Sequence, residues 1–402
     1  MMSQGDTLKV SGLINNNPKT KHNTTVTISP VNFIVSELQI KQDRSFLIGD
    51  KIIEPVNGQI EIEYGEEYIV NVLKYTDTYS KNVYINKEDS GREFHWHLEY
   101  QKYDKTTERT DPKIGKSFNF KLEKDYLADN NLKLCVRISH YDDIYTLELK
   151  VKFKFEFDRK TLVTEVNNRE KNPELIRQPG PLCGIAAPCY IWAKHHFEEY
   201  AETVLELHAM GKIKVNDFTI DPDSHLYKLK TSKIGNYKSA DWVLMASIRD
   251  SENTFIDYGD TDDDLPTNIA GVTPMSTVKK LVEKMCKYSI IEEDGWQGLF
   301  NKVPVVRWSI DKTKKYINNM DDYYINNKYE SLMMIDSDLI DDEPNISPDY
   351  HWVVYEGNLV KSDDRAKFDV YSWGSNTTYK VDDSYERIRR NWYQYLVVKC
   401  EK

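Results

Sequence analysis

The stretch Val151-Lys-Phe-Lys-Phe-Glu-Phe157 marks the point at which the chain changes character. Its odd positions are apolar and its even positions are charged, which is typical of a strand with one buried and one solvated face. The same alternation runs through earlier segments such as residues 59–64 and 94–100, which polar turns separate. Residues 1–165 are therefore predicted to form an all-β, antiparallel, sandwich-like domain.

Beyond this stretch the hydrophobic period changes from two to about 3.6 residues. The polar segment Asn167-Asn-Arg-Glu-Lys-Asn-Pro173 precedes the change, so we predict a linker over residues 166–178. A helix signal follows, with Gly211 at its expected C-terminal cap. Alternation returns near the C-terminal end, so residues 179–402 are predicted to form an α+β domain.

Composition narrows the class of protein. The 402 residues carry 54 Lys+Arg and 65 Asp+Glu, a formal net charge of −11, and no segment dominated by basic residues, which argues against nucleic acid as a partner. The sequence shows no run of about 18 apolar residues, so we expect no membrane span. The start of the chain lacks the apolar region of a Sec signal peptide, so synthesis in the cytoplasm without such a signal is expected.

Five widely spaced cysteines indicate reduced thiols in place of a disulfide framework. One of them, Cys183, lies in Gln178-Pro-Gly-Pro-Leu-Cys-Gly-Ile-Ala-Ala187, between a Pro/Gly-rich loop and an apolar helix. A helix N-terminus carries about half a positive charge and free N–H groups, so it stabilises a thiolate and a developing oxyanion. We predict that Cys183 is a nucleophile, that Gly184 lets substrate approach, and that Pro188 kinks or delays the helix.

A nucleophilic thiol needs a base, which is normally an imidazole. Of nine histidines, His351 has the most suitable place, because it opens an apolar strand whose start would hold the ring firmly. On the following strand Asp369, Tyr371 and Trp373 share a face. Asp369 is predicted to accept from one ring nitrogen while the other faces the thiol, with Asp349 as a reserve candidate.

These residues together resemble the papain-like cysteine peptidase fold: Cys-Gly-x-Ala at a helix start, His-x-Val at a strand start, and a strand that ends in Ser372-Trp373-Gly374. The longer pattern, which includes the Asp241-Trp242 helix, is similar to papain-like hydrolase domains of secreted bacterial toxins of the contractile-injection, type VI kind. The resemblance covers about residues 175 to 400. It implies no cofactor, a protein or peptidoglycan substrate, an immunity protein, a secretion-apparatus partner and export into target cells, with the β domain serving delivery or recognition.

Two positions depart from the family pattern. The family has Asn directly before Ser-Trp-Gly, whereas this chain has Tyr371, so the orienting role is predicted to pass to Asp369. The family's oxyanion glutamine lies six residues before the cysteine, whereas Gln178 lies five before it and is an oxyanion candidate. Trp352 and Trp373 are expected, with Gly184, to border the substrate cleft.

A metal site is not predicted. His95 and His97 share a strand face and can bind a metal, but the sequence suggests no third ligand, so we interpret them as structural. The acidic segments 259–264 and 336–343 lack the spacing of a calcium-binding loop. Cys189 is expected to be a core residue.

The predicted function is thiol hydrolysis of amide or peptide bonds, in which His351 deprotonates Cys183 and the thiolate attacks a carbonyl. The same residues serve proteases, peptidoglycan amidases and deamidases, so these alternatives stay open. A rival from another class is a non-enzymatic β-sandwich binding protein fused to a degenerate peptidase-like domain.

Overall fold

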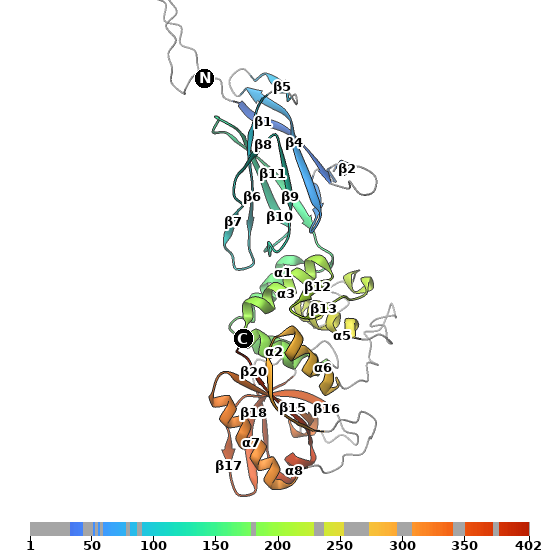
Figure 1. Ribbon diagram of the computed structural model, residues 1–402, viewed down its shortest axis with the longest axis vertical. Coiled ribbons are helices and arrows are strands. Elements are labelled where there is room, and N and C mark those ends of the chain that lie inside the picture. Colours follow the sequence, from blue (N-terminus) through green and yellow to red (C-terminus); the bar gives the residue numbers. More distant parts are fainter. Residues whose placement is uncertain are drawn as a thin grey trace, which may run out of the picture.

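The computed structural model describes residues 33–42, 51–52, 55–56, 59–77, 81–86, 91–177, 182–228, 237–252, 273–295, 308–340, 350–372 and 378–401. Over these residues the protein is mixed α+β with several antiparallel sheets, which confirms the predicted class. β-strands, a layer of helices and a second β region follow one another along the long axis (Figure 1). None of the described helices is long and apolar enough to cross a membrane.

Two sheets make up the N-terminal region. The first contains β1 (Phe33–Gln42), β2 (Lys51–Ile52), β4 (Glu67–Asp77), β5 (Val83–Ile85) and β9 (Ser117–Lys121). The second contains β3 (Ile60–Glu63), β6 (Phe94–Gln101), β7 (Thr107–Arg109), β8 (Lys113–Gly115), β10 (Asn131–Ile138) and β11 (Ile144–Lys152). β3 and β11 pair in parallel, and the other strand pairs described in these sheets are antiparallel.

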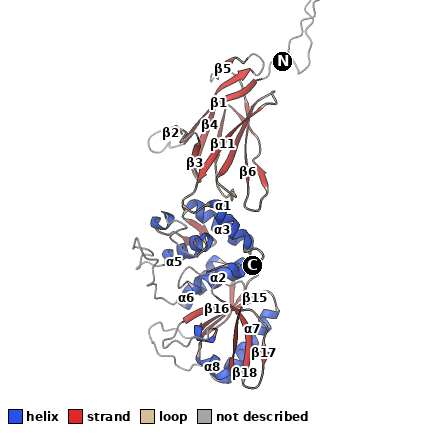
Figure 2. Cartoon of the chain, turned by 180° about the vertical axis from the view of Figure 1, so that it is seen from behind, coloured by secondary structure: helices blue, strands red, loops and turns tan. Residues whose placement is uncertain are grey.

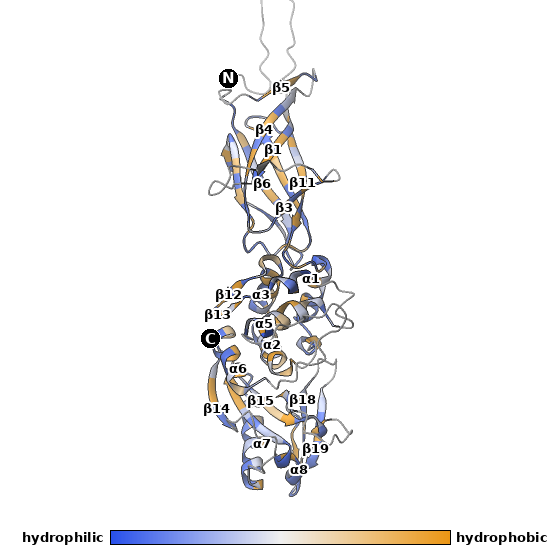
Figure 3. Ribbon diagram, turned by 90° about the vertical axis from the view of Figure 1, so that its right-hand side faces the viewer, coloured by the Kyte–Doolittle hydropathy of each residue, from blue (hydrophilic) through white to orange (hydrophobic). Residues whose placement is uncertain are grey.

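Both N-terminal sheets contribute to one hydrophobic core. Val70 and Phe118 enter it from the first sheet, and Trp96 and Leu134 enter it from the second. The rings of Trp96 and Phe118 stack across the core with their centroids 5.8 Å apart. Hydrophobic and hydrophilic bands alternate along these strands (Figure 3), as expected for sheets with one face buried.

The stretch from Val151 to Phe157 does not continue as a strand. β11 ends at Lys152, and the next residues bond to the end of helix α3 (Phe197–Met210). The amide of Lys154 donates to the carbonyl of Ala209, and that of Phe155 to the carbonyl of His208, both at 3.1 Å. Phe155 and Phe157 are buried in a second core, shared with the helices. The alternation of buried and solvated side chains is therefore present, but beyond Lys152 the backbone bonds to the end of a helix and not to another strand.

The described part of the predicted linker is packed against the rest of the protein. Helix α1 (Arg159–Asn168) begins before it and ends within it, and is capped by Asp158, whose carboxylate accepts from the amide of Thr161 at 2.8 Å. Further on, Arg169 forms a buried ion pair with Asp241 at 2.7 Å, and Ile176 is fully buried. Because a linker would be solvated, the change from sheet to helix is corrected to the neighbourhood of Asp158.

The helices that follow α1 gather in one layer between the two β regions (Figure 2). Their buried side chains share one hydrophobic core. The layer contains α2 (Cys183–His195), α3, a hairpin of β12 (Ile213–Val215) and β13 (Phe218–Ile220), α4 (Ser239–Asp241), α5 (Ser247–Glu252) and α6 (Met275–Lys280). Short 3-10 or π turns lie at Pro173–Leu175, Ser224–Lys228, Trp242–Ala246 and Leu281–Met285. Gly211 caps α3 with a φ of 78°, as predicted. α2 begins at Cys183 and runs unbroken past Pro188, so the proline does not delay it.

The C-terminal sheet is antiparallel, with the order β14-β20-β15-β16-β18-β17, and β19 pairs with β18. Its strands are β14 (Ser289–Gly295), β15 (Tyr329–Asp336), β16 (Tyr350–Tyr355), β17 (Val360–Lys361), β18 (Arg365–Tyr371), β19 (Tyr379–Ser384) and β20 (Trp392–Lys399). α2 packs against β16 on one face, and α7 (Ile310–Ile325) with α8 (Tyr385–Arg390) shares a separate core with the other face. A 3-10 turn at Ser337–Leu339 follows β15.

Candidate active site

Cys183 is the first residue of α2, as the sequence predicted. The carbonyl of Leu182 accepts hydrogen bonds from the amides of Ile185 and Ala186, which fixes the first turn of the helix. The Cys183 side chain is only 7% exposed and belongs to the core between α2 and the C-terminal sheet. The thiol therefore lies at the positive end of a helix with little solvent around it.

His351 is the second residue of β16 and is 4% exposed. Its Nε2 lies 2.6 Å from the hydroxyl oxygen of Ser372, which directly follows β18. Burial lowers the pKa of the His351 imidazole to about 3, so the ring is neutral at pH 7. Ser372 thus fixes the orientation of a neutral imidazole through one ring nitrogen.

A chain of contacts links the neighbours of Cys183 and His351. A Cβ added to Gly184 would lie 2.4 Å from the Cβ of Thr273, so only glycine fits there. The indole Nε1 of Trp352 donates to the backbone carbonyl of the same Thr273 at 2.9 Å. The start of α2 and the start of β16 are therefore held against one threonine.

The same contacts correct the predicted roles of Gly184 and Trp352. Thr273 fills the space above Gly184, through which substrate was expected to approach. Trp352 is fully buried, so it packs inside the protein and does not border a cleft. Both residues position the backbone around the candidate site.

A buried polar cluster holds the other end of α2 against the sheet. The ammonium of Lys194 lies 2.9 Å from the carboxylate of Glu330 on β15 and 3.0 Å from that of Glu356, just after β16. The hydroxyl of Tyr190 donates to Glu356 at 2.7 Å. Because these contacts join α2 to both strands, they fix the position of the helix relative to His351.

Asp369 does not orient His351, which contradicts the prediction. The amide of Glu356 donates to the carbonyl of Asp369 at 2.8 Å, so Asp369 lies opposite Glu356 on the neighbouring strand. Glu356 is five residues from His351, or about 16 Å along an extended chain. The Asp369 carboxylate accepts instead from the side-chain amide of Asn358 at 2.7 Å.

The error in assigning Asp369 has a geometric cause. Val354 pairs with Tyr371, so His351 and Ser372 lie on one face of the sheet and Asp369 and Tyr371 on the other. Ser372 was visible in the Ser-Trp-Gly motif. Side chains alternate between the two faces along each strand. With the observed pairing of β16 and β18, this alternation puts Ser372 on the same face as His351, so Ser372 is the residue that can reach the ring.

Tyr371, which stands where the family has asparagine, has a packing role that the sequence did not suggest. Its hydroxyl donates to the carbonyl of Ile176 at 2.7 Å, and its ring stacks on that of Tyr190 with centroids 3.8 Å apart. Burial raises the pKa of the Tyr371 hydroxyl, so it stays a neutral donor. Tyr371 therefore anchors the segment that leads toward Cys183.

The remaining candidates divide into two groups. Gln178, Trp373 and Asp349 lie outside the described residues. Cys189 is fully buried, as predicted, and burial raises the pKa of its thiol far above neutrality. The Cys400 thiol also has its pKa raised by burial. Both thiols are protonated at pH 7 and unsuited to nucleophilic attack.

The chain matches no protein-family model, and no curated protein shows significant sequence similarity to it. The arrangement of residues around α2, β16 and β18 is therefore the basis on which a function is inferred.

Proposed function

We propose that this protein is a thiol hydrolase with a papain-like arrangement, in which Cys183 is the nucleophile, His351 the general base and Ser372 the residue that orients the imidazole. The observation that carries the proposal is the 2.6 Å contact between Nε2 of His351 and the hydroxyl of Ser372, at the start of a strand against which the helix that begins with Cys183 packs. Ser372 supplies the hydrogen-bonding partner that asparagine supplies in the family.

The reaction follows from these positions. Nδ1 of His351 takes the proton of the Cys183 thiol as the sulfur attacks the carbonyl carbon of an amide. The imidazolium then returns the proton to the leaving nitrogen, the C–N bond breaks, and water hydrolyses the thioester. Backbone N–H groups at the start of α2 are the donors for the oxyanion.

The low pKa of His351 shapes the first step. A ring with a pKa of about 3 is neutral in the resting enzyme, so the proton moves during attack and not beforehand. Formation of the imidazolium is favoured only while the thiolate or the oxyanion lies beside it. The proposed enzyme thus resembles a serine hydrolase in its order of proton transfer.

Alkylation of the native full-length protein with iodoacetamide tests the proposal. Peptide mass spectrometry should show Cys183 reacting at least ten-fold faster than Cys189, which lies on the same helix and serves as the matched control. His351→Ala should slow labelling of Cys183 and leave that of Cys189 unchanged. Equal labelling rates at the two cysteines would contradict the proposal.

The proposed biological context is that of an injected antibacterial effector with a protein or peptidoglycan substrate, and it rests on the sequence resemblance. Expression of the wild type and of Cys183→Ala in the cytoplasm and in the periplasm of a bacterium tests it. Growth arrest by the wild type alone supports a toxin, and the sensitive compartment separates a protein substrate from peptidoglycan.

A second candidate is a binding protein whose hydrolase site is degenerate. Strand alternation places His351 on the face of Val353, whereas α2 covers the face of Trp352 and Val354. The ring must therefore reach the thiol around the end of the strand. Identical alkylation of Cys183 in the wild type and in His351→Ala would favour this second function.

A further inference from the structure

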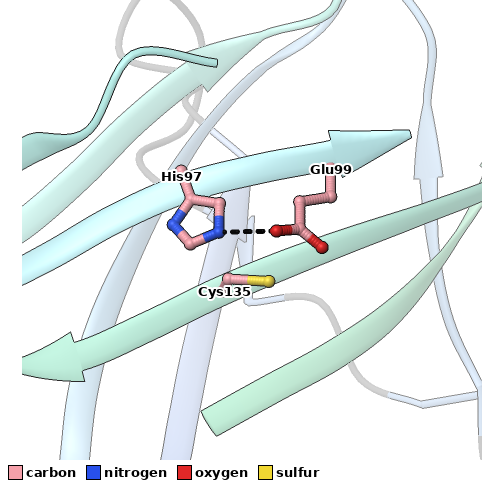
Figure 4. Close-up of side chains that lie close together, drawn as sticks. All are labelled: His97, Glu99 and Cys135. Carbon is pink, nitrogen blue, oxygen red and sulfur yellow. Dashed lines mark hydrogen bonds and ion pairs between the residues drawn. The ribbon is translucent and has the colours of Figure 1, made fainter. Parts of the chain in front are cut away.

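A second group of reactive side chains lies on the N-terminal β region, far from Cys183 in sequence. His97 and Glu99 are alternate residues of β6, and Cys135 lies directly opposite His97 on β10 (Figure 4). Their neighbours Leu98 and Leu134 enter the core between the sheets. Because side chains alternate along a strand, His97, Glu99 and Cys135 all face outward from that core.

The three side chains bring a nitrogen, an oxygen and a sulfur ligand together. One donor atom from each residue lies within 4.8 Å of the others, and Nε2 of His97 is 3.0 Å from Oε1 of Glu99. Zinc with bonds of about 2.0 to 2.3 Å holds tetrahedral donors about 3.3 to 3.8 Å apart. Side-chain rotations that move each donor atom by about 1 Å would therefore bring the three atoms to coordination distance.

The sheet holds this set in place before any ion binds. His97 is 5% exposed and Cys135 is 3% exposed, although both face away from the core. The thiol of Cys135 is 3.8 Å from the hydroxyl of Thr146 on β11, which is positioned to bond to a coordinated sulfur. Glu99 is more exposed, so the fourth position of a tetrahedron is open to water on that side.

We propose that His97, Glu99 and Cys135 form a zinc-binding site with water as the fourth ligand. Imidazole, carboxylate and thiolate together match the preferences of zinc better than those of calcium or magnesium, which take oxygen ligands. On binding, the Zn–S bond forms as the thiol proton passes to solvent. The proton on Nε2 of His97 moves through solvent to Nδ1, so that the freed Nε2 lone pair binds zinc and the contact between His97 and Glu99 is exchanged for two bonds to the metal.

Arg109 gives the proposal a distinctive prediction. Its guanidinium lies 3.3 Å from Nδ1 of His97, and its side chain is exposed. A cation at that distance repels a bound zinc ion and must swing away when zinc binds. Arg109→Gln should therefore tighten zinc binding, whereas in a purely structural cluster the loss of Arg109 would have no such effect.

Calorimetric titration of full-length protein with Zn²⁺, paired with absorption spectra in Co²⁺, tests the site. The wild type should bind one equivalent and show a thiolate-to-cobalt band. Cys135→Ser and Glu99→Gln should each weaken binding at least ten-fold, and Arg109→Gln should strengthen it several-fold. Circular dichroism establishes that each variant is folded, and Glu99→Gln, a change at a partly exposed carboxylate, is a second measurement should Cys135→Ser fail to fold.

Cys183→Ala is the control that separates the two thiol sites, because a reactive cysteine in a hydrolase can also bind zinc. The proposal requires that Cys183→Ala keep the wild-type affinity and the cobalt band. It is overturned if the wild type does not bind zinc, if Cys135→Ser and Glu99→Gln bind as the wild type does, or if Cys183→Ala alone abolishes binding. None of these results depends on hydrolase activity.

Discussion

The two histidine environments of this protein differ in the partner that each ring meets. His97 in the N-terminal sheets and His351 in the C-terminal sheet are similarly buried on strands, at 5% and 4% exposure. His97 contacts the carboxylate of Glu99, with a thiol opposite, whereas His351 contacts the neutral hydroxyl of Ser372. An anionic partner suits a bound cation, and a neutral partner in an apolar setting suits a ring that accepts a proton only transiently.

The largest expected effect is that each cysteine variant should lose the property of its own site, hydrolysis or zinc binding, and keep that of the other. Cys183→Ala should reduce hydrolysis or toxicity at least about a thousand-fold, because it removes the nucleophile, and should leave zinc binding unchanged. Cys135→Ser should weaken zinc binding and leave hydrolysis or toxicity unchanged. The measurements are growth assays and hydrolysis of a cell proteome and of purified peptidoglycan, with Cys189→Ala as the control. A loss of both properties in either variant would break the comparison.

The next effect concerns the boundary between the two regions. A chain that begins at residue 179 lacks α1 and Arg169, and leaves the buried carboxylate of Asp241 without its partner. Loss of one member of a buried ion pair costs about 3–5 kcal/mol, so this fragment should not fold. A chain that begins near Val151 should fold. Circular dichroism and gel filtration of the two fragments check this expectation, which a well-folded shorter fragment would refute.

Ser372→Ala should lower the turnover number about ten- to hundred-fold with the fold intact, because the imidazole loses the contact that sets its orientation and tautomer. Asp369→Asn is the matched control. Its carboxylate bonds to Asn358, so the activity of this variant should stay near that of the wild type. The opposite ranking of the two variants in steady-state kinetics would restore the aspartate as the orienting residue.

Stability should fall in acid because two histidines are buried in the neutral form. Burial lowers the pKa of His351 to about 3, and burial together with the charge of Arg159 lowers that of His208 to about 3. The unfolded chain binds protons at these rings near pH 6.5 and the folded chain near pH 3, so the unfolding free energy declines between these values. At pH 5 each ring should contribute a loss of about 2 kcal/mol.

Urea unfolding at pH 7, 6 and 5 measures this decline. His351→Gln should flatten it by about half, since His208 still contributes. His208, whose Nε2 donates to the carbonyl of Phe157 at 2.9 Å, is the internal comparison. A pH-independent unfolding free energy in the wild type would show that neither ring is held neutral.

The sequence predicted local features correctly and cross-strand features poorly. The start of a helix at Cys183 depends on a few neighbouring residues, and the structure places it there. The choice between Asp369 and Ser372 depends on register with a strand about twenty residues away, where an error of one position moves a side chain to the other face.

The sequence did not predict that Cys135 lies beside His97 or that the segment around Arg169 is packed, and both omissions have the same origin. Cys135 meets His97 only through the pairing of β6 with β10, which no spacing along the chain reveals. The composition of the polar segment around Arg169 is typical of a linker. Asp241, whose carboxylate pairs with Arg169 in the interior, is distant in sequence, so local composition does not reveal that the segment is buried. Charge pairing of this kind hides buried residues from composition-based prediction.

The smallest predicted effect tests Tyr371, for which the sequence suggested no role. Tyr371→Phe removes the hydroxyl that donates to the carbonyl of Ile176 and leaves that buried carbonyl without this donor. An unpaired buried polar group costs about 1–3 kcal/mol, so the urea midpoint should fall measurably while the ring keeps its stacking on Tyr190. Tyr145→Phe, on the partly exposed strand β11, is the control and should change the midpoint little. Because Ile176 lies seven residues before Cys183 in the sequence, alkylation of Cys183 should also slow in Tyr371→Phe. A variant with wild-type stability and labelling would show that the stacked ring alone holds the segment in place.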